Sequence, residues 1–408
     1  MELKDIIIGS GEYGIPASSI DYQEGYPIYL RITDITDDGF FMPNPKVSFD
    51  YRNYDYEKYK LQESDIVFAR TGNSTGRNYL YNKDDGDLYY AGFLIKYKLD
   101  KSKVIPDFIR FYCKSYQYWN WIRNVSKDGS TRKKMNAQDY LKMPIPEVPM
   151  PRQQEIVDKL IPLEDKIKSN WRLINYLVEY SQLLFHKWFI DFNFPNEKGL
   201  PYKDNGGEMI KVDGKMLPKG WKIDSINTFG EIVSGGTPST AHEEYFTDNG
   251  IPWITPKDLS QKNTMYIKKG EIDITKLGLK NSSAKIMPKG TVLMSSRAPI
   301  GYLTIARNDV TTNQGFKSIV PRKSEFSEFI YFTLKSKMKQ IHSISSGSTF
   351  REISKEMMNK LKVVVPPDDK IVEYYCLNKS IFEKIALLEN EQELLRESRD
   401  LLIKKLIK

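Results

Sequence analysis

The chain of 408 residues has little of what metal sites and disulfide frameworks need. It contains two cysteines, Cys113 and Cys376, and three histidines that are scattered without the spacing of metal ligands. This scarcity excludes a disulfide scaffold and a zinc site. No apolar run approaches the roughly 18 residues of a membrane span, and the first residues lack the pattern of a secretory signal. The composition therefore predicts a soluble protein of the cytoplasm.

Signatures of catalysis are also missing. No phosphate-binding loop of the form GxxxxGK[ST] occurs, nor the [ND]-P-P-[FYW] tetrapeptide of adenine methyltransferases. The glycines Gly9, Gly11 and Gly14 fit GxGxxG, but no convincing helix follows them, as a dinucleotide site would require. His342 has no neighbouring carboxylate that could orient it as a base. We therefore predict that the chain is not an enzyme by itself and holds no catalytic residues, cofactor or metal.

The positive charge is unevenly distributed. The chain carries 61 Lys and Arg against 53 Asp and Glu, a net charge of +8. Residues 1–151, 152–192 and 369–408 are each neutral, so the whole excess lies in 193–368, which has 26 basic and 18 acidic side chains. Such a region attracts nucleic acid through counterion release, although a lysine-rich solubilising surface explains the charge equally well. The isolated second region is predicted to bind random DNA better than the first.

The chain repeats one plan twice. The matching pairs are YPIYLRITDITDDG (26–39) with GIPWITPKDLSQKN (250–263), SDIVFART (64–71) with GTVLMSSR (290–297), Gly92-Phe93 with Gly315-Phe316, and Gly129-Ser130-Thr131 with Gly347-Ser348-Thr349. Because the pairs occur in the same order, they indicate an internal duplication. Each copy has short apolar runs between turn residues, typical of strands, and helical pieces at 106–122 and 327–341. The order is lobe, helix, lobe, helix.

Two long segments, 152–192 and 369–408, follow the two lobes. Their apolar residues recur at a 3–4 spacing over about five heptads, which is typical of coiled-coil helices; ordinary core helices are the alternative. A lone helix of roughly 57 to 60 Å would expose its apolar stripe, so we expect the two to pair in antiparallel fashion. The stripe residues expected to make this pair or to receive a partner subunit include Asn170, Leu177, Leu184, Ile385, Leu388, Leu395 and Leu402.

Two polar loops in each lobe are suited to nucleic acid. Arg fits the guanine edge and Asn or Gln the adenine edge, while small hydroxylated residues before a helix offer donors to phosphate. For any single residue a turn or capping role is as good an explanation, so the pairing across the repeat supports the set. The first-lobe candidates are Arg70, Thr71, Asn73, Ser74, Arg77, Asn78, Lys127, Ser130, Thr131, Arg132, Lys133 and Lys134. The second-lobe candidates are Ser239, Thr240, Lys257, Ser295, Ser296, Arg297, Asn313, Gln314, Ser346, Ser348, Thr349 and Arg351.

Taken together, these motifs resemble the DNA-specificity subunits of type I restriction-modification systems. The resemblance covers essentially the whole chain and is carried by SGGTPST, GIPWITPKDL, LMSSRAPIGY, NQGFKSI and SGSTFREISKEMMNKLKVVVPP. The first lobe is a less standard copy, because it has no counterpart of LPKGW and has LYYAGFLIKY in place of NQGFKSI.

The resemblance implies an α+β fold with two similar β-rich target-recognition domains, 1–151 and 193–368, and two antiparallel coiled-coil spacers, 152–192 and 369–408. Each domain would read one part of a split duplex DNA sequence, and the helices would set the unread gap. A four-residue insertion in either helix, about 6 Å of rise, should then change the gap and not the half-site bases.

The resemblance also implies partners. Two modification subunits with S-adenosylmethionine and two restriction subunits with ATP and Mg²⁺ would assemble on the chain, which itself would hold none of these cofactors. The alternative is a stand-alone DNA methyltransferase or nuclease with two recognition lobes. A protein-interaction scaffold without a DNA role comes third.

Overall fold

The computed structural model describes residues 1–43, 45–126, 134–262, 264–297, 299–345 and 352–407. The chain divides into two compact units. Unit 1 comprises Met1–Ser169 and Gln392–Lys408, and unit 2 comprises Asn170–Glu391. Each unit is a lobe of short strands and helices together with parts of the two long helices, α4 (Met150–Phe189) and α10 (Asp368–Leu406). Both helices begin and end within three residues of the predicted segments.

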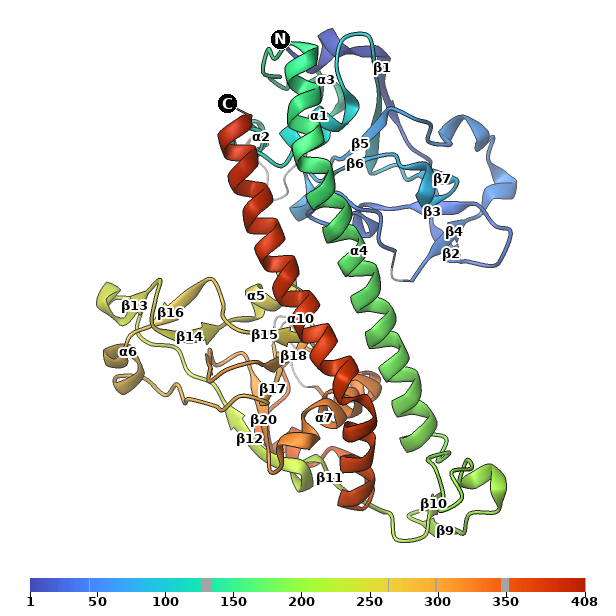
Figure 1. Ribbon diagram of the computed structural model, residues 1–408, viewed down its shortest axis with the longest axis vertical. Coiled ribbons are helices and arrows are strands. Elements are labelled where there is room, and N and C mark those ends of the chain that lie inside the picture. Colours follow the sequence, from blue (N-terminus) through green and yellow to red (C-terminus); the bar gives the residue numbers. More distant parts are fainter. Residues whose placement is uncertain (44, 127–133, 263, 298, 346–351, 408) are drawn as a thin grey trace. The chain divides into compact units, whose positions relative to one another are not determined.

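Unit 1 is built around a four-stranded antiparallel sheet of order β1-β8-β5-β6 (Figure 1). Its elements are β1 (Ile7–Tyr13), β2 (Ser19–Asp21), β3 (Ile28–Leu30), β4 (Val47–Phe49), β5 (Asp65–Ala69), β6 (Asn78–Leu80), β7 (Leu88–Tyr90), β8 (Leu94–Leu99), α1 (Pro106–Tyr112), α2 (Tyr116–Val125) and α3 (Ala137–Leu141). The strand β5 is buried throughout because apolar side chains cover both faces, and Phe68 shares one core with Phe108 of α1 and Tyr118 of α2.

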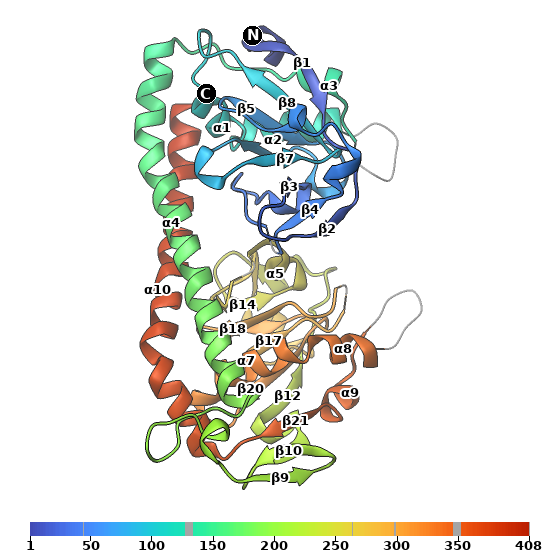
Figure 2. The same cartoon turned by 90° about the vertical axis from the view of Figure 1, so that its right-hand side faces the viewer.

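Unit 2 contains a five-stranded sheet of order β12-β20-β17-β18-β15 and a four-stranded sheet of order β13-β16-β14-β19. Its elements are β9 (Met209–Val212), β10 (Lys215–Pro218), β11 (Lys222–Ser225), β12 (Gly230–Ser234), β13 (Phe246–Thr247), β14 (Ile251–Ile254), α5 (Pro256–Lys262), β15 (Tyr266–Ile267), β16 (Ile272–Ile274), α6 (Lys276–Lys280), β17 (Val292–Met294), β18 (Leu303–Ala306), β19 (Thr311–Thr312), β20 (Lys317–Pro321), α7 (Ser327–Ser336), α8 (Met338–Ile344), α9 (Lys355–Asn359) and β21 (Lys362–Val365). The helix α7 packs on the five-stranded sheet (Figure 2). The helical pieces predicted at 106–122 and 327–341 are therefore confirmed, each as two consecutive helices.

The duplication is visible in hydrogen bonds that both lobes repeat. In unit 1 the phenol of Tyr29 donates to the carbonyl of Ile15 at 2.7 Å. In unit 2 the indole nitrogen of Trp253 donates to the carbonyl of Gly236 at 3.0 Å. Tyr29 and Trp253 lie on β3 and β14, which each pair in parallel with a short strand, β7 and β19. Two aromatic residues with different chemistry therefore pin the same loop in the two lobes.

A second repeated feature is the turn that follows these strands. The amide of Arg31 donates to the carboxylate of Asp34 at 2.8 Å, and the amide of Thr255 donates to that of Asp258 at 2.7 Å. Backbone amides at the start of a helical turn have no carbonyl partner within that turn. The carboxylate three residues later in the chain accepts the hydrogen bond from such an amide. The match between 26–39 and 250–263 therefore reflects a common fold.

One of the predicted repeat pairs is displaced by one residue. The register places Leu94 opposite Ala69 and Phe316 opposite Ser295. Leu94, and not Phe93, is therefore the equivalent of Phe316. Phe93 is 60% exposed whereas Phe316 is fully buried, so the shared Gly-Phe letters were a coincidence of sequence.

The glycines of the apparent GxGxxG motif do not open a helix. Gly9 and Gly11 lie within β1, and Gly14 follows the end of this strand. A Cβ atom on Gly14 would stand 2.2 Å from the carbonyl oxygen of Tyr90. Glycine is required there for the close approach of two backbones, which agrees with the prediction that this is no dinucleotide fold.

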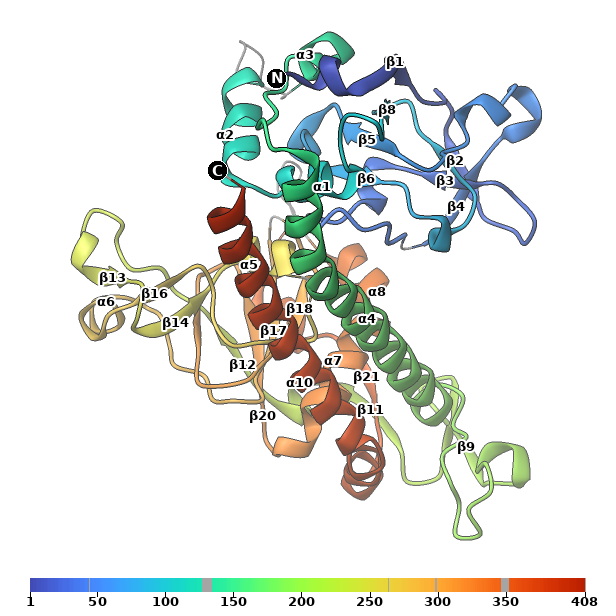
Figure 3. The same ribbon diagram turned by 45° about the horizontal axis from the view of Figure 1, so that its top comes forward.

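Within each unit the parts of α4 and α10 run antiparallel. In unit 2, Asn170 donates to Glu391 at 2.8 Å, and Tyr374 donates to the carbonyl of Ser181 at 2.9 Å. Residues with higher numbers on α4 therefore contact residues with lower numbers on α10, as in an antiparallel pair. In unit 1 the end of α10 lies beside α2, where Gln117 donates to the carbonyl of Ile407 at 3.5 Å (Figure 3).

The predicted stripe describes most of this helix pair. Asn170, Ile385 and Leu388 are buried, while the other four predicted residues are partly buried: Leu177, Leu184, Leu395 and Leu402. Near the end of α10 the fully buried residues are Ile403 and Ile407, one position after the predicted stripe. A straight helix with 3.6 residues per turn drifts from a 3.5-residue repeat, so a stripe drawn at constant spacing slips by one residue over this length.

Candidate nucleic-acid interface

In unit 1 three chain segments meet where β5 ends. The amide of Arg70 donates to the carbonyl of Phe93 at 3.1 Å, and the amide of Met135 donates to the carbonyl of Arg70 at 2.9 Å. The next residue, Thr71, lies opposite Lys134 in an antiparallel bridge. This arrangement joins the end of β5, the start of β8 and the segment at 134–135 into one edge.

Unit 2 repeats this edge bond for bond. The amide of Ser296 donates to the carbonyl of Gly315 at 2.7 Å, and the amide of Ile353 donates to the carbonyl of Ser296 at 3.0 Å. Arg297 then lies opposite Glu352 in an antiparallel bridge. We call these two equivalent sites the three-strand edges. Their backbones correspond, but the side chains that they carry differ.

The arginines at the edge of unit 1 are held by neighbouring side chains. The guanidinium of Arg70 lies 4.8 Å from the centre of the Tyr13 ring, and the Tyr13 hydroxyl accepts a hydrogen bond from the amide of Ala137 at 3.1 Å. Arg77 donates to the carboxylate of Asp37 at 2.6 Å and is 30% exposed. Cation–π contact and ion pairing thus fix two cations with part of their surface open to solvent.

The edge of unit 2 carries three linked charges. Arg297 Nη1 lies 3.3 Å from one oxygen of Glu352, and Lys317 Nζ lies 3.6 Å from the other. Lys317 also donates to the hydroxyl of Ser296 at 3.4 Å. Arg297 and Glu352 are 40% and 39% exposed, whereas the Lys317 side chain is only 9% exposed. A nearly buried lysine therefore anchors a carboxylate that braces an accessible arginine.

The edge of unit 2 carries two amide side chains at positions where unit 1 has small residues. Gln314 is exposed and accepts a hydrogen bond from the hydroxyl of Thr237, and Asn313 accepts one from the amide of Gly315 at 2.9 Å. By the register of the sheets, Ala91 and Gly92 occupy the corresponding positions in unit 1. The two edges thus present different donors and acceptors.

The remaining described candidates occupy turns and ion pairs. Asn73 and Ser74 belong to the short turn after β5, and Ser239 and Thr240 are exposed. Lys257 is paired with Glu271 at 2.7 Å. Nine further candidates lie outside the described residues, namely Lys127, Ser130, Thr131, Arg132, Lys133, Ser346, Ser348, Thr349 and Arg351.

Three predicted contact residues require correction because their side chains are buried. Ser295 and Ser296 have no exposed surface, and Asn78 has 7%. The Ser295 hydroxyl donates to the carbonyl of Pro299 at 2.8 Å, and the Asn78 amide donates to that of Gly76 at 3.3 Å. These hydrogen bonds shape the edge from within, so we remove the three residues from the set that could touch nucleic acid. Sequence reasoning could not separate them from exposed neighbours because polarity alone does not determine which way a strand residue points.

Sequence reasoning also missed a buried charge cluster in unit 1. Arg399 of α10 contacts Asp38 at 2.7 Å and Glu164 of α4 at 2.9 Å. Arg396 contacts Asp38 at 2.7 Å, and Lys114 lies 3.6 Å from Glu164. Burial alone would raise the pKa of Asp38, but the charges of Arg396, Arg399 and Lys114 outweigh it and lower the pKa to about 2. The preceding residue, Asp37, binds Arg77, so one short turn connects the edge to the long helices.

A second missed group is the pair Lys317 and Glu352. A lysine inside the mostly apolar run GFKSIV was a usable signal, because a buried lysine needs a partner. The predicted interface contains cations, amides and hydroxyls, so it does not include the acidic Glu352.

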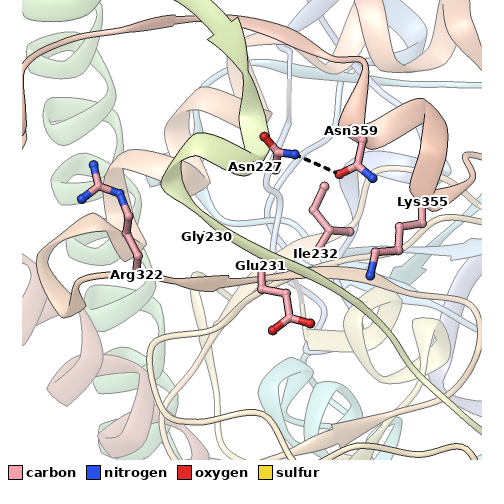
Figure 4. A pocket seen from close by; sticks show the side chains of 7 residues that line it. All are labelled: Asn227, Gly230, Glu231, Ile232, Arg322, Lys355 and Asn359. Carbon is pink, nitrogen blue, oxygen red and sulfur yellow. Dashed lines mark hydrogen bonds between the residues drawn. The ribbon is translucent and has the colours of Figure 1, made fainter.

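Unit 2 also has an open pocket of about 500 Å³. Asn227 donates to Asn359 at 3.4 Å on its wall, and Figure 4 shows Lys355 and Arg322 on opposite sides. Arg322 is engaged by Asp368 at 2.8 Å. The pocket adjoins Gly230 at the start of β12, the opposite end from the three-strand edge, so it is not part of the candidate interface.

The described residues contain no group of three or more His, Cys, Asp or Glu side chains that could hold a metal ion. Among the same residues, no helix combines the length and apolar character needed to cross a membrane.

The family profile of the type I restriction modification DNA specificity domain matches residues 1–178 and 218–402. The chain belongs to this family. The two matched stretches each begin at a lobe and extend into the long helix that follows it. The duplication found in the hydrogen bonds therefore corresponds to two copies of the family's domain.

Known relatives agree with this assignment. The chain is 41% identical over 195 residues to the type I restriction enzyme MjaIX specificity subunit of Methanocaldococcus jannaschii, a match that spans 44% of this chain and 45% of that protein. It is 24% identical to the HindI specificity subunit of Haemophilus influenzae, across 86% of this chain and 87% of that protein. The fold also resembles the crystal structure of a type I restriction-modification S subunit from M. genitalium, with a TM-score of 0.54 and 15% identity over 100% of this chain and 95% of that one.

Proposed function

We propose that this chain is the specificity subunit of a type I restriction-modification complex and reads a bipartite target in double-stranded DNA. The observation that carries the proposal is the pair of three-strand edges. They have one backbone frame, yet they present Arg70, Thr71 and Lys134 in unit 1 and Arg297, Gln314 and Glu352 in unit 2. A duplicated frame with different polar side chains suits the reading of two different half-sites.

Phosphate contacts would position each lobe, and base contacts would select the sequence. Lys134 is exposed, and Arg77 and Lys257 are partly or largely exposed while paired with a carboxylate. On binding, a phosphate oxygen can replace such a carboxylate as the partner of the cation. Counterion release would make this binding strongly dependent on salt.

The long helices would receive the partner subunits. Leu387, Leu394 and Leu401 recur every seven residues on α10 and are 63%, 57% and 68% exposed. An apolar stripe of this kind is typical of a face that another helix covers. We propose that two modification subunits and two restriction subunits assemble with the chain in the cytoplasm, and that S-adenosylmethionine, ATP and Mg²⁺ are held by these partners.

The proposal assigns no catalysis to this chain. The experiment that tests it combines the chain with its modification subunits and maps the methylated adenines on a DNA library. A split target whose two parts depend on different lobes supports the proposal, and methylation without a sequence preference contradicts it. Incubating the purified chain alone with DNA, S-adenosylmethionine and Mg²⁺ tests the enzyme alternative, which requires methylation or cleavage without partners.

A further inference from the structure

We infer that Arg297, braced by Glu352, reads a guanine in the half-site recognised by unit 2. The inference rests on the proposed function and adds to it one base and the residue that selects it. It depends on the position of Arg297 in the three-strand edge, on the ion pairs that orient it, and on the difference from unit 1.

The backbone at Arg297 is fixed by the fold. The preceding residue, Ser296, is fully buried and makes two backbone hydrogen bonds, to Gly315 at 2.7 Å and to Ile353 at 3.0 Å. Arg297 itself lies in a bridge with Glu352. A side chain that starts from a rigid strand end can be aimed at a base with little loss of conformational freedom.

The guanidinium is oriented and still accessible. Within the described part of the chain, Glu352 is the residue that pairs with Arg297, and it does so through Nη1 at 3.3 Å. An arginine has five N–H donors in a planar fork, so a contact at one nitrogen leaves donors for a second partner. Two parallel N–H groups of such a fork match O6 and N7 of guanine in the major groove.

A phosphate is an unsuitable partner for Arg297 because the buried Lys317 holds Glu352 in place, so that a phosphate cannot readily displace this carboxylate. A phosphate bound to Arg297 would come close to the negative charge of Glu352, and like charges repel at short range. A neutral base edge meets no such repulsion. The cytosine that pairs with the guanine also carries an amino group, which can donate a hydrogen bond to a carboxylate.

Lys317 explains why the carboxylate stays in place. Its ammonium lies 3.6 Å from Glu352 and is almost completely buried on β20. The pair between Arg297 and Glu352 is too exposed to contribute much to stability. A buried lysine behind an exposed carboxylate is therefore better explained by the orientation of the arginine than by the stability of the fold.

Unit 1 has a different pair at the same bridge, Thr71 and Lys134. Neither side chain can present a planar fork of donors. A guanine contact from this bridge position is therefore specific to unit 2, and the bridge is one place where the side chains of the two lobes differ.

The test uses the complex of the chain with its modification subunits and measures methylation of a DNA library. Arg297→Ala should reduce the preference for guanine at one position of one half-site by roughly 10- to 100-fold, with the other half-site and the gap unchanged. Arg297→Lys keeps the charge but not the planar fork, and should weaken the same preference by less than Arg297→Ala does. The double change Arg297→Thr with Glu352→Lys, which installs the pair of unit 1, should lose it as well.

Lys257→Ala is the matched control, because this exposed lysine of unit 2 is also paired with a carboxylate; it should leave every base preference unchanged. An equal fall in activity on all sequences after Arg297→Ala, with no change in preference, would identify a phosphate contact and overturn the inference. Altered preference at a base other than guanine, or in the other half-site, would overturn it too. If the unaltered complex shows no sequence preference, the proposed function fails instead.

Discussion

The two units join their lobes to the long helices through apolar cores, but they differ in the contacts that accompany these cores. In unit 1 both helices share an apolar core with the lobe, through residues such as Leu160 of α4 and Ile403 of α10. The lobe is also held by ion pairs from Asp38 to Arg396 and Arg399 of α10. In unit 2 the shared core is rich in aromatic rings: Phe189 of α4 lies 4.8 Å from Phe329 of α7 and 5.3 Å from Tyr374 of α10 between ring centres. The duplicated fold thus keeps an apolar junction in both units and varies the contacts that are added to it.

The polar groups of the unit 2 junction also behave differently. The carboxylate of Glu389 on α10 accepts hydrogen bonds from the backbone amides of Met265 and Tyr266, at 2.7 and 3.0 Å. The Tyr266 hydroxyl donates to Glu328 of α7 at 2.8 Å. Burial raises the pKa of Glu328 to about 7, only partly offset by the Tyr266 hydrogen bond, whereas arginines lower that of Asp38 to about 2. The stability of the two units should therefore respond to pH in opposite directions.

The largest effect is expected for Arg399→Met in unit 1. The change leaves Asp38 and Glu164 buried with one cation fewer, and breaking a buried ion cluster in this way costs about 3 to 5 kcal/mol. Hydrogen exchange of the amides in unit 1 measures the loss, with the amides of unit 2 as an internal reference. Lys404→Met on an exposed position of α10 is the control. Equal exchange in the variant and the control would show that the cluster contributes nothing.

Glu328→Gln should stabilise unit 2 at pH 8. A carboxyl with a raised pKa in the folded state lowers stability above its unfolded pKa near 4.5, and this loss accumulates up to about pH 7. The glutamine can still accept the hydrogen bond from the Tyr266 hydroxyl, and it carries no charge. The expected gain in the free energy of unfolding is of the order of 2 to 3 kcal/mol at pH 8, and it vanishes near pH 4. Exchange of the unit 2 amides at several pH values checks this. A gain of the same size at every pH would contradict the assignment.

Asp38→Asn should destabilise unit 1 with the reverse dependence on pH. A carboxyl whose folded pKa is depressed contributes stability above its unfolded pKa near 3.8, and loses it as the pH falls toward about 2. The expected loss is about 2 kcal/mol at pH 7, and it should disappear in acid. Asp55→Asn, on an 82% exposed carboxylate of the same unit, is the control. If Asp38→Asn still destabilises unit 1 more than Asp55→Asn does in strong acid, titration of Asp38 is not the cause of the difference.

The sequence predicted the features that the two lobes share, but not the side-chain contacts that are particular to one lobe. The duplicated order of motifs and the two long helices followed from apolar spacing and turn residues, because backbone frames leave periodic traces in sequence. The family was indicated by the resemblance of particular motifs, such as SGGTPST and NQGFKSI. The charge cluster of Asp38, Glu164 and Arg399 left no such traces, since its members lie far apart in the chain and meet only after folding. Burial removed Asn78, Ser295 and Ser296 from the candidate interface for the same reason: polarity is a property of the residue, but exposure is a property of the fold.

The smallest effect on stability is expected where both units pair an exposed cation with a carboxylate. Asp37→Asn in unit 1 releases Arg77, and Glu271→Gln in unit 2 releases Lys257. Exposed ion pairs contribute about 0 to 1 kcal/mol, so hydrogen exchange should hardly change in either unit. Binding to duplex DNA should become tighter in both variants because a cation loses its competing carboxylate. The dependence of the logarithm of affinity on the logarithm of salt concentration should steepen by about one. If only one variant binds more tightly, the lobe that carries it is the one whose cation meets the DNA backbone, and the two edges then differ in positioning as well as in base reading.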